Sequence, residues 1–337
     1  MATDPTGRGQ MQRPARGSGH EANAAPGIFD TIAVAMSALL LRPLPLLVPI
    51  VIDLYLSAGA RLSPAGLLEP IRRWLASQGN VADVQITGPL EALDRLSRTG
   101  DLAAIVGWFV PSLVVDGGQT AERAVWSRPS LDLGGALGTL GFAFVLLLLG
   151  IWGAMAFAAM LARVVRGRSP LGDHFVRDSG IAGLRYLGFL GLVLLALIVI
   201  LVPSSIVGAV LMAFGIDIVS LLVTVFLAPA VAAYVCLAFV GEAIVVANVG
   251  PLRACALSFG IVRRNVWPTV GFLLVLVIAS AGLARLGAQM AGSASGLLLA
   301  IAAYAFVATG LALARMQFFY DRLRRWRADL IPAMAPA

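Results

Sequence analysis

The sequence predicts an all-α integral membrane protein with about six transmembrane helices and three interfacial amphipathic elbow helices. Of the 337 residues, 59% are hydrophobic and only 13% are charged, and the mean hydropathy is +0.89. These values lie far outside the range of soluble globular domains. Long apolar runs recur along the chain, and a helix needs roughly 17 to 25 such residues to cross a bilayer. The runs lie at about residues 44–60, 136–161, 186–214, 218–247, 267–287 and 295–316.

Residues 250–280 combine an interfacial elbow helix with the start of a span. Gly250 and Pro251 are a favourable helix start, because proline at the first helical position loses no hydrogen bond. Apolar residues then recur at a spacing of three and four, which is typical of a helix that lies in the membrane interface. This apolar face consists of Leu252, Cys255, Ala256, Phe259 and Val262.

Basic and aromatic side chains at the elbows are candidate interfacial lipid anchors. Arginine keeps its charge among the headgroups while its stem lies along apolar surface, and tryptophan favours the interface. We therefore expect contact with the lipid bilayer and with anionic lipid headgroups. The candidate anchors are Arg42, Arg185, Arg263, Arg264 and Trp267.

The elbow pattern suggests three elbow-plus-hairpin repeats. Ser179 stands six residues before Arg185, just as Ser258 stands six residues before Arg264. The first elbow, near residues 27–43, has Met36 at the equivalent place and matches less well. Duplication and a polytopic scaffold without true repetition both account for the pattern.

The chain divides into a single membrane domain, residues 27–330, and two tails. Residues 1–26 are rich in small and polar residues, which predicts a disordered cytoplasmic tail, and residues 331–337 form a flexible C-terminal tail. Residues 61–134 are a hydrophilic insertion between the first two spans. Its apolar patch, residues 102–115, has 14 residues, too few for a core of roughly 30 Å. The patch either re-enters the membrane or lies against it.

Arginine placement predicts the orientation. Arginines cluster after the second, fourth and sixth apolar runs, whereas the connection between the third and fourth runs has none. By the positive-inside rule, both termini are cytoplasmic and the insertion is extracytoplasmic. The prediction is a multi-pass protein of the cell membrane.

Two carboxylates inside apolar runs are the candidate intramembrane site residues. Such a group costs about 2.5 to 3.5 kcal/mol on insertion scales and is a functional candidate by default. Glu242 could form a structural ion pair with Arg163, Arg166 or Arg315, or serve a proton or substrate site. Asp53 is expected to face the bundle or a water-filled cavity, in either a structural or a functional role.

The sequence offers no catalytic or metal-binding motif. His20 and His174 lack clustered ligands, and Cys236 and Cys255 form no CxxC motif, so we expect no metal, cofactor or enzyme activity. The net charge is +7, but the arginines lie beside the apolar runs and the sequence contains no nucleic-acid-binding motif. We therefore expect no nucleic-acid partner.

The stretch EAIVVANVGPLRACALSFGIVRRNVW and the span after it, residues 242–280, carry a family resemblance. They resemble the membrane domain attached to some bacterial glycerophosphodiester phosphodiesterases and related stand-alone bacterial membrane families. The resemblance implies a fold and a location in the bacterial inner membrane. It implies no activity, because no catalytic domain follows and the carboxylate and histidine cluster of such an enzyme is absent.

Two functions of different classes fit these observations. The favoured one is a non-enzymatic membrane scaffold or accessory subunit, with room for a membrane-protein partner or a homo-oligomer. The alternative is a transporter or lipid translocator that uses intramembrane Asp53 and Glu242.

Overall fold

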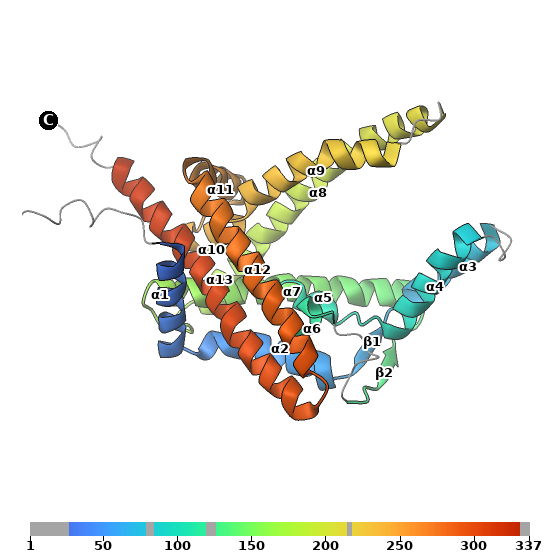
Figure 1. Cartoon of the computed structure of the whole chain (residues 1–337), viewed down its shortest axis with the longest axis horizontal. Helices are drawn as coiled ribbons and strands as arrows, with labels where there is room; N and C mark the ends of the chain where they lie inside the picture. Colours follow the sequence, from blue (N-terminus) through green and yellow to red (C-terminus); the bar gives the residue numbers. More distant parts are fainter. Residues whose placement is uncertain (1–26, 79–83, 119–125, 214–217, 331–337) are drawn as a thin grey trace, which may run out of the picture.

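The computed structural model describes residues 27–78, 84–118, 126–213 and 218–330 (Figure 1). These residues are almost entirely helical, as the sequence predicts. The predicted tails, residues 1–26 and 331–337, lie outside the described residues.

Five helical regions are long and apolar enough to cross a membrane, and a sixth qualifies only as a bent pair of helices. This confirms the predicted class, a multi-pass protein with about six spans. The five are α7 (Ala136–Val165), α8 (Phe175–Ala213), the region Phe226–Ala247 within α9 (Ile218–Leu237) and α10 (Val240–Ala247), α12 (Val266–Met290), and α13 (Ala294–Leu330).

The first predicted elbow and span form the bent pair. Helix α1 (Ile28–Leu41) is followed by the short 3-10 helix η2 (Leu44–Leu46) and by α2 (Leu47–Ala58). The two arms meet at an angle of 91°. Pro43 and Pro45 explain the bend, because proline lacks a backbone N–H and its ring clashes with the carbonyl four residues earlier.

The other two elbows differ from each other. Helix α11 (Pro251–Arg264) ends before α12 begins. In a continuous helix, Pro268 would have no N–H to donate to the carbonyl of Arg264, and its ring would clash with that carbonyl. The second elbow is not a separate helix, and α8 runs without interruption from Phe175 into the span. Its first proline is Pro203, so nothing comparable ends the helix near Tyr186.

The insertion begins and ends at a pair of short parallel strands. Strand β1 (Arg61–Ser63) pairs with β2 (Ser130–Asp132), with Arg61 opposite Ser130. Between them, α3 (Ala65–Gln78) and α4 (Val84–Thr99) form a hairpin that projects away from the other helices in Figure 1. Two single-turn helices follow, α5 (Ala104–Gly107) and α6 (Leu113–Asp116).

Residues 104–116 enter the helix bundle. A Cβ atom at Gly150 of α7 would lie only 2.9 Å from the Phe109 ring, and one at Gly287 of α12 only 2.6 Å from Leu113. Glycine is required for so close an approach. Leu113 is fully buried, and so is Ser112 before it. Residues 104–116, the inserted segment, therefore pack into the helix bundle, and both predicted placements of the patch relative to the membrane stay predictions.

Helix α13 contributes much of the core. Phe318 stacks on Phe272 of α12 with ring centroids 4.4 Å apart, and on Phe239 at 5.6 Å. The apolar part of α8, by contrast, has no buried residue in its most hydrophobic window. In Figure 1, α8 and α9 extend together from the remaining helices. These exposed apolar side chains are suited to contact with lipid.

Candidate functional site

Asp53 lies near the middle of α2 and binds the inserted segment, residues 104–116. Its carboxylate accepts hydrogen bonds from Ser112 Oγ at 2.5 Å and from the backbone N–H groups of Leu113 and Val114 at 2.9 and 3.3 Å. The residue is fully buried. Asp53 therefore satisfies the backbone donors at the start of α6, and it faces the bundle as predicted.

A second polar contact holds the other end of α6. The hydroxyl of Tyr304 in α13 donates a hydrogen bond to Asp116 Oδ2. The inserted segment is thus bound to α2 through Asp53 and to α13 through Tyr304, two helices that are distant in the sequence.

Glu242 in the first turn of α10 pairs with Arg315 of α13. Arg315 Nε lies 2.6 Å from Glu242 Oε1, and Arg315 Nη2 donates a hydrogen bond of 3.2 Å to Oε2. The Glu242 side chain is 10% exposed and that of Arg315 is 38% exposed. Of the three arginines considered from the sequence, only Arg315 meets Glu242. Arg163 pairs with Asp178, and Arg166 donates to the carbonyl of Val246.

The same arginine stabilises a break between α9 and α10. Nη2 of Arg315 also donates to the carbonyl of Ala238, in the turn between the two helices. Ser258 of α11 is fully buried, donates to the carbonyl of Cys236 at 2.6 Å and accepts from the N–H of Phe239 at 3.2 Å. Side chains from two other helices therefore replace the hydrogen bonds that the break removes.

A cavity of about 290 Å³ adjoins this ion pair. It lies among α7, α8, α10 and α13, and the inserted segment contributes Phe109 and Pro111. Tyr186, Glu242 and Arg315 are its polar side chains, and every other lining residue is apolar or glycine. The arrangement offers one guanidinium beside an apolar wall.

The predicted lipid anchors divide into two groups. Arg42 donates to the carbonyls of Gly167 and Arg168 at 2.5 Å, and Arg185 donates to Asn248 Oδ1. Arg42 therefore joins the end of α1 to the turn after α7, and Arg185 joins the body of α8 to the end of α10. Within the described part of the chain, the side chains of Arg263, Arg264 and Trp267 make no such hydrogen bond. Arg264 covers the Trp326 ring at 4.8 Å, Trp267 is 84% exposed, and Arg263 is also exposed.

Sequence reasoning missed the ion pair of Asp101 and Arg128. Arg128 Nη2 lies 2.5 Å from Asp101 Oδ2, and both side chains are about nine-tenths buried. Asp101 Oδ1 also accepts from the N–H groups of Leu62 and Ala103. The position of Asp101 just before the apolar patch at residues 102–115 could have indicated this role, because aspartate often accepts hydrogen bonds from backbone N–H groups at a turn.

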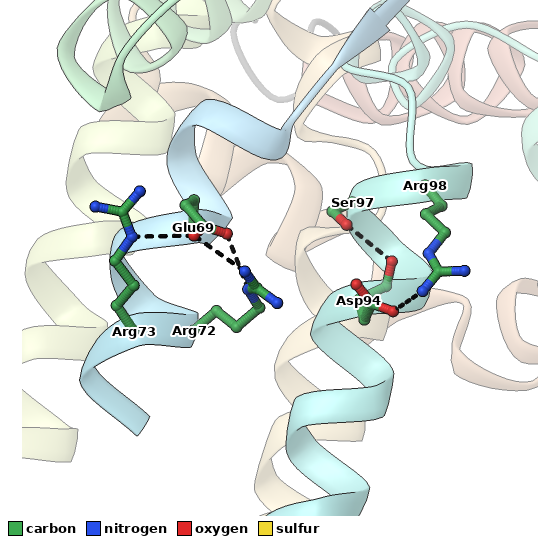
Figure 2. Close-up of polar contacts among 6 residues, drawn as sticks. All are labelled: Glu69, Arg72, Arg73, Asp94, Ser97 and Arg98. Atoms are coloured by element: carbon green, nitrogen blue, oxygen red, sulfur yellow. Dashed lines mark hydrogen bonds and ion pairs between the residues drawn. The ribbon is translucent and has the colours of Figure 1, made fainter. Parts of the chain in front are cut away.

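The charged groups of the α3–α4 hairpin are exposed instead. Figure 2 shows Glu69 between Arg72 and Arg73, with N–O distances of 2.8 and 3.0 Å, and a separate pair of Asp94 with Arg98. The hydrogen bond from Arg72, then that from Arg73, lowers the pKa of Glu69 to about 2. All of these pairs lie within single helix turns.

Within the residues that the structure describes, no three histidine, cysteine, aspartate or glutamate side chains converge on a metal-sized site. Cys236 and Cys255 are free thiols. No family model matches the chain, and no curated protein or solved structure is significantly similar to it.

Proposed function

We propose that this multi-pass membrane protein is a non-enzymatic scaffold or accessory subunit of the cell membrane, with both termini in the cytoplasm. The observation that carries the proposal is the occupation of both intramembrane carboxylates by groups of their own chain. Asp53 accepts three hydrogen bonds from residues 112–114, and Glu242 pairs with Arg315.

These contacts argue against proton or substrate exchange at Asp53. Three donors satisfy its carboxylate at once, and Tyr304 fastens the same segment through Asp116. A transport cycle that used Asp53 would have to release a buried segment and leave two backbone N–H groups unsatisfied. A permanent structural role requires no such step.

The outer surface supports a role in organising lipid or protein. Arg263 is exposed at the end of α11 and Trp267 at the start of α12, where anionic headgroups would meet them. The exposed apolar sides of α8 and α9 suit lipid, a membrane-protein partner or a second copy of the chain. The resemblance of residues 242–280 to the membrane domain of bacterial phosphodiesterases agrees with a membrane-embedded role without chemistry of its own.

The test is gentle extraction with native lipids, followed by native mass spectrometry of the protein and its Asp53→Asn and Glu242→Gln variants. We expect both variants to keep any protein partner and to lose thermal stability. Glu91→Gln, at an exposed position of α4, is the matched control and should change neither quantity. A protein partner that the folded variants release would contradict a purely structural role of these carboxylates.

A second function, lipid translocation, is favoured by the cavity beside Glu242 and Arg315. Broken helices near a polar pair are the usual setting of substrate sites in membrane transporters. Flux of a fluorescent phospholipid in proteoliposomes separates the two functions. Flux that the wild type supports and that folded Glu242→Gln lacks would establish translocation and overturn the scaffold proposal.

A further inference from the structure

We propose that the cavity beside Arg315 binds one anionic phospholipid, with the lipid phosphate on the guanidinium and part of an acyl chain against the apolar wall. This site does not depend on the scaffold proposal. A scaffold could hold the lipid permanently, and a translocator could exchange it.

The charge at the cavity favours an anion. Arg315 is 38% exposed whereas its partner Glu242 is only 10% exposed, so the accessible part of the pair is the cation. Arg166 and Arg185 donate to Val246 and Asn248 at the end of α10, which adds positive charge nearby. Glu242 is the one carboxylate among the residues that line the cavity.

Arg315 also retains hydrogen-bonding capacity. Its contacts with Glu242 Oε2 and the Ala238 carbonyl come from Nη2, and Nε faces Glu242 Oε1. Among the described residues, Nη1 has no hydrogen-bond acceptor. A guanidinium presents five N–H donors in a planar fork that matches the geometry of a phosphate.

The wall of the cavity selects a lipid over a soluble phosphate. Phe157 and Phe189 provide apolar surface, and Met155 and Met316 are unbranched side chains that adapt to flexible ligands. The volume of about 290 Å³ is close to the lower limit of ordinary ligand pockets, roughly 300 Å³. It accommodates part of one acyl chain and leaves the rest of the lipid in the bilayer.

The experiment is native mass spectrometry of the full chain after detergent delipidation and titration with phosphatidylglycerol, phosphatidylcholine or inorganic phosphate. We expect one phosphatidylglycerol to be retained. Phosphatidylcholine and inorganic phosphate should compete poorly. Arg315→Gln should weaken retention at least about tenfold, the effect of losing a charge-assisted hydrogen bond. Glu242→Gln should retain the lipid as well as the wild type or better, because it removes the competing carboxylate.

A pair of variants keeps the test decisive if Arg315→Gln fails to fold. Ala312→Leu fills the cavity from α13, and Ala303→Leu makes the same change at an exposed position of that helix. Only Ala312→Leu should lose the lipid. Equal retention by both variants, or equal retention of the two lipids, would overturn the proposal. Competition by inorganic phosphate as effective as that of the lipid would assign the site to a soluble anion and overturn it as well.

Discussion

The ion pair of Glu242 and the ion pairs of Glu69 both join a glutamate carboxylate to arginine, but the Glu242 carboxylate is largely buried and the Glu69 pairs are exposed to solvent. Glu69 meets Arg72 and Arg73 within one exposed helix, at N–O distances of 2.8 and 3.0 Å (Figure 2). Glu242 meets Arg315 at 2.6 Å across two helices, where its side chain is 10% exposed. The distances are similar, so the surroundings decide what each pair contributes to stability.

Access to water determines how much each ion pair contributes to stability. Around Glu69, solvent screens the attraction and solvates either partner when the other is removed, so such pairs contribute little. At the Glu242 pair, removal of Arg315 leaves a carboxylate that is only 10% exposed, and an unpaired charge with so little access to water is strongly destabilising. The following four predictions test this comparison in order of decreasing effect.

The largest effect is expected from Glu242→Gln and Arg315→Gln. Arg315→Gln leaves the largely buried Glu242 carboxylate unpaired and should lower the free energy of unfolding by on the order of 3 kcal/mol, whereas Glu242→Gln leaves the more exposed Arg315 and should cost less. Unfolding of the purified protein in mild detergent measures the change. The double variant should recover part of the loss, because it leaves no unpaired charge. Single variants as stable as the wild type would remove the contrast with Glu69.

Asp53→Ala should come next. It removes the acceptor of three hydrogen bonds and leaves the N–H groups of Leu113 and Val114 buried without a partner. We expect a loss of about 2 kcal/mol and faster hydrogen exchange in residues 104–116. Ser112→Ala is the control: it removes the hydroxyl bond to Asp53 and the cap of the Val115 N–H but keeps the Asp53 carboxylate for Leu113 and Val114, so it should have the smaller effect. Unchanged exchange in the segment would show that Asp53 does not hold it.

Ser258→Ala tests both the role of Ser258 at the break between α9 and α10 and the predicted equivalence of Ser258 and Ser179 in a repeat. It removes two hydrogen bonds that satisfy backbone groups between α9 and α10, at a cost of about 1 to 2 kcal/mol. Ser179 is equally buried but donates only to the carbonyl of Val176 in its own helix. Ser179→Ala should therefore cost less in the same thermal unfolding assay. Equal costs would indicate that the two serines play equivalent parts in a repeat.

The smallest effect is expected at Glu69. Its lowered pKa, about 2, means that the carboxylate pairing is complete above the ordinary value near 4.5 and is lost as the pH falls through about 2. Carboxyl chemical shifts of ¹³C-labelled glutamate should follow this titration, with Glu69→Gln as the assignment control. Because solvent screens this exposed pair, Glu69→Gln should lower the unfolding temperature at pH 7 only slightly. A Glu69 that titrates at its ordinary pKa would mean that the arginines do not hold it.

Local features of the sequence determined the membrane class, the approximate spans and two of the helix boundaries. Apolar runs long enough to cross a bilayer are visible without tertiary structure, because each residue of a span meets lipid or apolar protein. Pro43 and Pro268 act on the carbonyl four residues earlier, so their effect on α1 and α11 is also local. The second elbow was harder to predict, since nothing nearby stops α8.

Only the tertiary structure decided which polar groups meet. Three arginines could have paired with Glu242, and the relative rotation of α10 and α13 selected Arg315. The partners of Asp53 lie 59 to 61 residues further along the chain, and Ser258 acts 19 and 22 residues away. Local propensity sets where a helix begins and ends, whereas packing between helices sets the direction in which each side chain points.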